Sequence, residues 1–273
     1  MLEYLTLPYF RNALIGVVLL SIVAGIIGTY IVSRRLVAIS GGITHTCFGG
    51  LGLGNFLGIN PLVMAAVFAV GASLGVEWMS QRRAMRQDTA IAVVWALGMA
   101  LGVLFVSLTP GYVPELTAFL FGTILMIGSA DLWAIAIYAM VLGAFFMLCH
   151  RKIVICAFDS DFAAVAGLRV RLINYTMTVL VAIGIVLAIR MVGIMLLMSM
   201  LSLPQLIAEQ RYHRFASIMW ASIAVSLMCS VGSLMLCTVV DVPCSAVIVI
   251  VMVGVYIVAS GCNALAKHHR DKQ

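Results

Sequence analysis

A succession of apolar segments, each about 20 residues long and separated by short polar links, constrains this chain most strongly. A helix needs about 20 apolar residues to cross the hydrocarbon core of a bilayer. A soluble fold cannot bury so much apolar surface, because 64% of the 273 residues are hydrophobic and only 10% are charged. The sequence therefore predicts an all-α, polytopic transmembrane bundle of about eight to nine crossings, forming a single transmembrane domain over residues 1–273. The predicted crossings are residues 12–32, 36–58, 61–79, 90–108, 130–149, 172–190, 192–208, 215–238 and 243–265.

One further apolar piece, residues 115–128, is too short to span comfortably and is interpreted as a broken or re-entrant helix. The first apolar segment is longer than the core of a signal peptide and has no small-residue cleavage site before Arg34. We therefore expect it to remain as the first crossing.

Orientation follows from the basic residues, which collect in the cytoplasmic links of membrane proteins. Only Arg11 and Arg190 lie away from one set of links and the C-terminus. That set is predicted to be cytoplasmic and contains Arg34, Arg35, Arg82, Arg83, Arg86, Arg151, Lys152, Arg169, Arg171, Arg211, Arg214, Lys267, Arg270 and Lys272. Because the basic residues do not form a stripe with interleaved aromatics, nucleic acid is not expected as a partner.

The long cytoplasmic link, residues 150–171, has its own local signals. Asp159 or Ser160 is a suitable N-cap for a short helix that Gly167 would end. This segment is predicted to be a docking element.

The sequence motifs exclude several kinds of chemistry. The chain has no GxxxxGK[ST] phosphate loop, so any energy from ATP must come from a separate subunit. It has neither a GxSxG elbow nor an HExxH motif, which disfavours an intramembrane hydrolase. The seven cysteines form no CxxC or CxxH pattern, so neither a zinc knuckle nor a disulfide framework is expected.

The most unusual segment is residues 40–58, SGGITHTCFGGLGLGNFLG, in which seven glycines interrupt an apolar crossing. Glycines permit close helix approach, and they also permit unwound backbone at a binding site in the membrane. We expect a helix break at a binding site within the membrane here, involving Gly41, Gly42, Gly49 and Gly50.

His45 lies within this run, and an ionisable group inside a crossing is a candidate for function. Its neutral imidazole suits Zn²⁺, Fe²⁺ or Mn²⁺. The alternative is a hydrogen bond to a neighbouring helix. Cys47 is a weaker candidate ligand, because it shares a helical face with His45 only if the backbone unwinds. Glu77 lies near the predicted cytoplasmic boundary, where a solvated or ion-paired role is expected.

Seven segments in the same order resemble the ABC-3 family of integral membrane permeases of bacterial ABC importers for zinc, manganese or iron. The resemblance spans nearly the whole chain. It rests on RR at 34–35 with ISGGITH and GINP following, DTAI at 88–91, PGY at 110–112, LFGTIL at 120–125, AFDSDFAAVAGLRV at 157–170, RMVGIMLLMSMLSLP at 190–204 and DVPCSAVIVIV at 241–251.

The resemblance implies a type II-like importer in the bacterial cytoplasmic membrane, with no cofactor of its own and a divalent metal as its substrate. The implied partners are a cytoplasmic ABC ATPase subunit, an extracytoplasmic metal-binding protein and a second permease, either another copy in a homodimer or a similar chain. It also implies that Phe158, Asp159 and Gly167 belong to a coupling helix that inserts into the ATPase, and that His45 lies on the metal pathway.

One departure from the family pattern concerns the position four residues before His45. Many members have an acidic residue there, which shares a helical face with the histidine, whereas this chain has Gly41. The hypothesis is an ABC importer permease for divalent transition metals, without enzymatic activity. The alternative is a stand-alone secondary carrier, although mid-crossing carboxylates are absent from the sequence.

Overall fold

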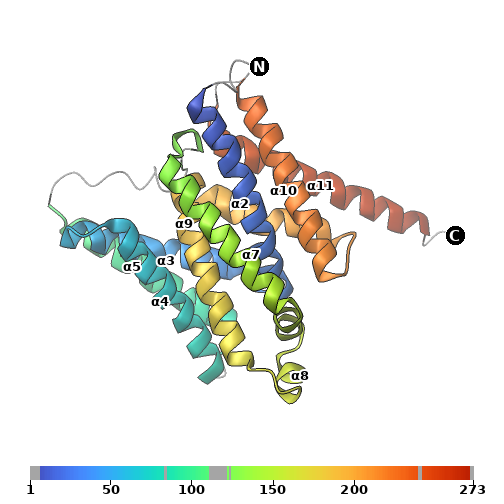
Figure 1. Cartoon of the computed structure of the whole chain (residues 1–273), viewed down its shortest axis with the longest axis horizontal. Helices are drawn as coiled ribbons and strands as arrows, with labels where there is room; N and C mark the ends of the chain where they lie inside the picture. Colours follow the sequence, from blue (N-terminus) through green and yellow to red (C-terminus); the bar gives the residue numbers. More distant parts are fainter. Residues whose placement is uncertain (1–6, 83–84, 111–121, 123, 239–241, 271–273) are drawn as a thin grey trace. The chain divides into compact units, whose positions relative to one another are not determined.

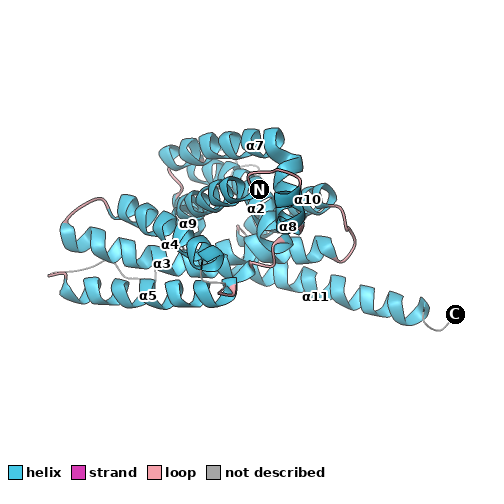
Figure 2. Cartoon of the chain, turned by 90° about the horizontal axis from the view of Figure 1, so that it is seen from below, coloured by secondary structure: helices cyan, strands magenta, loops and turns pink. Residues whose placement is uncertain are grey.

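The computed structural model describes residues 7–82, 85–110, 122, 124–238 and 242–270. This part of the chain is helical with short links and contains no strand (Figure 2). The elements are α2 (Pro8–Ser33), α3 (Val37–Leu57), α4 (Pro61–Arg82), α5 (Gln87–Leu108), the 3₁₀ turn η1 (Ile124–Met126), α7 (Ser129–Phe158), α8 (Ser160–Val165), α9 (Val170–Glu209), α10 (Phe215–Cys237) and α11 (Cys244–Arg270) (Figure 1).

Seven of the described helices are long and apolar enough to cross a membrane, namely α2, α4, α5, α7, α9, α10 and α11. Helix α3 has 21 residues and would be about 31 Å long, but its glycines lower its hydropathy. The all-α, multi-pass architecture predicted from the apolar segments is confirmed, and the crossing count is close to the predicted one. The predicted short piece 115–128 lies largely outside the described residues.

Helix α9 contains two of the predicted crossings, 172–190 and 192–208. A straight helix of its 40 residues would be about 60 Å long, roughly twice the thickness of the hydrocarbon core. Gly193 interrupts it with non-helical angles, φ 77° and ψ 172°. Only glycine adopts this region of backbone space readily.

The chain divides into two compact units. Unit 1 comprises residues 1–32, 120–139 and 191–273, and unit 2 comprises residues 33–119 and 140–190. The prediction of a single domain stays a prediction.

In unit 1, α2 packs against α10 and the second part of α9. The Ser226 hydroxyl donates to Ser21 Oγ at 3.2 Å, which joins α10 to α2. Pro204 lies inside α9 and has no N–H for the carbonyl of Met200. The side-chain amide of Gln205 donates instead to that carbonyl at 3.4 Å and to Ala24 O of α2 at 2.9 Å. The proline is therefore compensated by a buried amide that also holds α2.

In unit 2, α3 lies between α4 and α5 and contacts both (Figures 1 and 2). It ends at Gly58, whose left-handed φ of 67° allows the Ile59 N–H to reach Gly54 O at 3.0 Å. Helix α4 begins at Pro61, and the Leu62 N–H donates to Asn60 Oδ1 at 3.0 Å. The GINP segment thus builds the tight turn that brings α4 back along α3.

Candidate functional site

The glycines of α3 do not break the helix. Helix α3 is continuous from Val37 to Leu57, so the break expected at Gly41, Gly42, Gly49 and Gly50 is not present. A Cβ on Gly49 would lie 2.7 Å from Gly98 O of α5, and one on Gly50 would lie 2.6 Å from the Ala65 Cα of α4. The glycines therefore allow α4 and α5 to approach the α3 backbone closely. Close helix approach is the role that the sequence analysis named as the alternative to unwound backbone.

This close approach extends along α3 on both sides. A Cβ on Gly42 would lie 2.6 Å from Ile91 Cγ2, and one on Gly54 would lie 2.6 Å from the Pro61 Cα. The Thr46 hydroxyl donates to Gly42 O at 2.7 Å and to Val94 O of α5 at 3.3 Å. Helix α3 is thus held between its neighbours over most of its length.

His45 lies near the middle of α3 and is partly exposed, whereas the residues on either side of it are buried. Its imidazole stacks on the Trp95 indole of α5, with ring centroids 4.7 Å apart and an interplanar angle of 9°. Stacking fixes the plane of the imidazole and leaves its two nitrogens at the ring edge. Trp95 was missed by the sequence reasoning, because nothing in the sequence relates two residues 50 positions apart.

Cys47 does not join His45 in one site. In a continuous helix, residues i and i+2 point about 200° apart. Cys47 is only 2% exposed and packs in the core of unit 2. Among the described residues no group of three or more His, Cys, Asp or Glu is arranged to hold a metal. His45 therefore belongs to no such cluster within this part of the chain.

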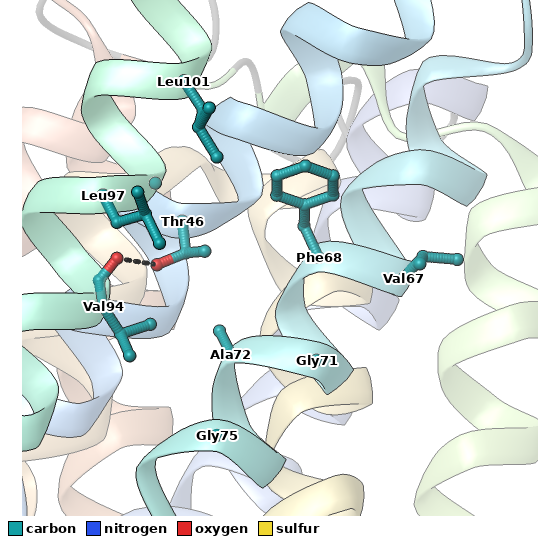
Figure 3. Close-up of a pocket in the computed structure, with 10 residues that line it drawn as sticks. Thr46, Val67, Phe68, Gly71, Ala72, Gly75, Val94, Leu97 and Leu101 are labelled. Carbon is teal, nitrogen blue, oxygen red and sulfur yellow. Dashed lines mark hydrogen bonds between the residues drawn. The ribbon is translucent and has the colours of Figure 1, made fainter. Parts of the chain in front are cut away.

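A cavity of about 430 Å³ lies beside α3 but does not include His45 (Figure 3). The Thr46 hydroxyl lies at its wall and is hydrogen-bonded to Val94 O. The lining is almost entirely apolar, so it offers no ligand set for a metal ion. The lining residues are Thr46, Val67, Phe68, Gly71, Ala72, Gly75, Val94, Leu97, Gly98 and Leu101.

The predicted short helix in the long cytoplasmic link is present as α8. The Asp159 carboxylate accepts from the N–H groups of Asp161 at 3.1 Å and Phe162 at 2.8 Å, which is an N-cap. Gly167 follows with φ 77° and turns the chain toward α9. The link is shorter than the predicted residues 150–171, because α7 continues to Phe158 and α9 begins at Val170.

Exposed apolar side chains lie at this element, beside the exposed polar residues Asp159, Ser160 and Asp161. Phe158, Phe162 and Val165 are 61%, 60% and 88% exposed. Large apolar side chains that are exposed within a short stretch of sequence are typical of a protein-docking surface.

Unit 2 also contains a series of polar side chains that contact one another, and the sequence predicted only part of it. Glu77 is 2% exposed and its carboxylate lies 3.8 Å from the Arg34 guanidinium. The Gln81 side-chain amide donates to Glu77 Oε1 at 2.7 Å, and Arg171 Nε donates to Gln81 Oε1 at 3.2 Å. The sequence indicated an ion-paired or solvated role for Glu77, and the ion-paired role is the one observed.

Comparison with known proteins decides the family. The family model described as the ABC 3 transport family matches residues 6–263. The chain belongs to this family. As a member of the ABC 3 transport family it is a multi-pass protein of the bacterial cytoplasmic membrane and a permease subunit rather than an enzyme.

Several relatives of this ABC 3 protein carry functional names. A Chlamydia pneumoniae protein named "probable metal transport system membrane protein" is 34% identical, over 94% of this chain and 88% of the relative. The Listeria monocytogenes "manganese transport system membrane protein MntC" is 31% identical, over 72% of this chain and 70% of its own.

The fold of this ABC 3 protein also matches a solved structure. The structure titled "PsaBC from Streptococcus pneumoniae in complex with Fab" superposes with a TM-score of 0.82 at 24% identity. The match covers 94% of this chain and 93% of the matched one.

Proposed function

We propose that this chain is the membrane permease of an ATP-driven importer for divalent transition metal ions, with manganese as its foremost substrate. The observation that carries the proposal is the partly exposed His45 imidazole on a buried, glycine-packed helix of a family whose named relatives are metal transport proteins. An imidazole inside a membrane-spanning bundle is costly without a functional role. Neutral imidazole is also a suitable ligand for manganese, zinc and ferrous ions.

A single imidazole binds a metal weakly, which suits a pathway better than a storage site. The absence of a carboxylate at Gly41 removes the one ligand that the continuous helix would place on the same face. The remaining ligands would come from water or from the His45 of a second permease copy. Transport requires binding that is weak enough to release the ion.

The energy for transport would come from a separate cytoplasmic ATPase that docks on α8. The exposed Phe158, Phe162 and Val165 provide the apolar contact, and Asp159 and Gly167 fix the ends of the helix that presents it. An extracytoplasmic metal-binding protein would deliver the ion. The family membership disfavours the stand-alone carrier, which would not need a docking element of this kind.

The test is metal uptake into proteoliposomes that contain this chain with its ATPase and its delivering protein. We expect ATP-dependent uptake of manganese, and we expect His45→Ala to reduce it about tenfold or more, by analogy with the loss of a metal-site interaction. The matched control is His213→Ala, because His213 is an exposed histidine in the link between α9 and α10. Absence of uptake for manganese, zinc and iron alike would refute the substrate class, and full uptake by His45→Ala would refute the role of His45.

A further inference from the structure

The ion pair between Arg34 and Glu77 is unusual for its burial. The two side chains are 10% and 3% exposed, and the charged groups lie 3.8 Å apart. Removing two charges from water costs several kcal/mol per ion, and the attraction between them often does no more than offset that cost. Such a pair contributes little net stability compared with well-packed apolar residues, so a functional reason for it is worth seeking.

The pair belongs to a chain of contacts that crosses three parts of unit 2. Arg34 lies in the three-residue link between α2 and α3, Glu77 and Gln81 lie on the last turns of α4, and Arg171 is the second residue of α9. The contacts run from Arg34 to Glu77, from Glu77 to Gln81 at 2.7 Å, and from Gln81 to Arg171 at 3.2 Å. We call these four residues the polar relay.

Each end of the polar relay lies beside a segment of the proposed transport machinery. Arg171 follows α8 by six residues, across the left-handed Gly167. Arg34 precedes the first residue of α3 by three positions. The adjoining Arg35 has a left-handed φ of 58°, which is uncommon for a residue with a side chain. His45 lies eight residues into α3, about 12 Å along the helix axis.

We propose that the polar relay transmits movement of the ATPase-docking helix α8 to α3, and that Glu77 is its central positioning residue. Displacement of α8 moves the start of α9 and therefore Arg171. Gln81 and Glu77 follow through hydrogen bonds, and Arg34 then shifts the start of α3 on its short link. The closely packed α3 moves as a rigid body and carries His45. This inference rests on the proposed function, because it assumes an ATPase that docks on α8. The contacts that form the polar relay all lie within unit 2.

The central variant is Glu77→Gln, which removes the charge and retains an oxygen that accepts from Gln81. The second variant is Arg171→Leu, which removes the outermost link at an exposed residue, where we expect the substitution to leave folding intact. The matched control is Arg86→Gln. Arg86 pairs with Asp88 at the same 3.8 Å, but these side chains are 86% and 61% exposed.

The first readout is the ratio of metal imported to ATP hydrolysed by the reconstituted complex. We expect Glu77→Gln and Arg171→Leu to retain hydrolysis while this ratio falls about fivefold or more, a typical size for a lost coupling between two sites. Arg86→Gln should leave the ratio unchanged. A merely structural role would reduce hydrolysis and import in the same proportion, which would overturn the proposal.

The second readout needs the ATPase but no transported ion. Ala38 is exposed on the first turn of α3. The maleimide reaction rate of Ala38→Cys, corrected for the chain without this added cysteine, reports movement there. We expect the rate to change on ATP binding, and we expect Glu77→Gln to abolish that change. Two results would refute the relay. In one, ATP does not change the labelling rate when Glu77 is present; in the other, ATP changes the rate equally in the Glu77→Gln variant. If no metal is imported at all, the proposed substrate is wrong and this labelling still decides the relay.

Discussion

Helices α3 and α9 use glycine in opposite ways. Helix α3 contains a run of glycines and remains helical from end to end. Helix α9 is interrupted by the single residue Gly193. The difference lies in what surrounds each glycine. At Gly49 and Gly50 the backbones of α5 and α4 occupy the space where a side chain would be. At Gly193 the backbone itself leaves the helical region, and Gly122 packs directly against the interruption.

The comparison shows that glycine content by itself does not predict a break. A glycine costs about 1 kcal/mol of helix propensity relative to alanine. Close packing against two neighbouring helices offsets that cost in α3, whereas positive φ at Gly193 uses the freedom that only glycine has. Helix α3, which carries His45, is therefore continuous and tightly packed, whereas α9 bends at Gly193.

The largest effect is expected for Gly50→Ala. The added methyl group would meet the backbone of Met64 and Ala65, which cannot move as a side chain can. We expect the free energy of unfolding to fall by about 3 kcal/mol, at the upper end for overpacking. Chemical unfolding of the purified permease in detergent measures it. An unchanged stability would show that α3 and α4 are not in close contact, and the rigid-helix half of the comparison would fail.

A somewhat smaller effect is expected for Gly193→Ala. Alanine at φ 77° and ψ 172° is strained, so we expect a loss of about 2 kcal/mol. The same unfolding measurement applies. If the variant is instead more stable than the original chain, α9 is a continuous helix there and the bend is not a property of the native protein.

The smallest effect, and the control for both, is expected for Gly71→Ala on α4. A methyl group at this position meets nothing within 4 Å, and its backbone is helical. Alanine should stabilise the helix by about 0.5–1 kcal/mol through its higher propensity. A clear loss of stability would indicate that a neighbour absent from the isolated chain packs on this face.

Local signals account for what the sequence predicted well. The apolar runs set the positions of the long helices, since run length is a property of neighbouring residues. Helix α8 was predicted from the Asp159 cap and from Gly167, which lie only eight residues apart. The family resemblance was carried by short segments in register and is confirmed by the match over residues 6–263.

Long-range relations account for what the sequence did not predict. Whether the α3 glycines unwind or pack depends on Gly98, Ala65 and other residues of neighbouring helices. The stack of His45 on Trp95 joins two helices, and so does the pairing of Arg34 with Glu77. The interruption of α9 at Gly193 was not predicted, because a lone glycine in an apolar run has no distinctive pattern.

Equilibrium binding of radiolabelled manganese to the purified permease tests the central claim most directly. We predict measurable binding that His45→Ala weakens about tenfold or more and that His213→Ala leaves intact. We also predict weakened binding in Gly50→Ala at temperatures where that variant is still folded, because the helix that carries His45 would be displaced. Equal binding by the original chain and by His45→Ala would contradict the assignment of α3 as the metal-carrying helix.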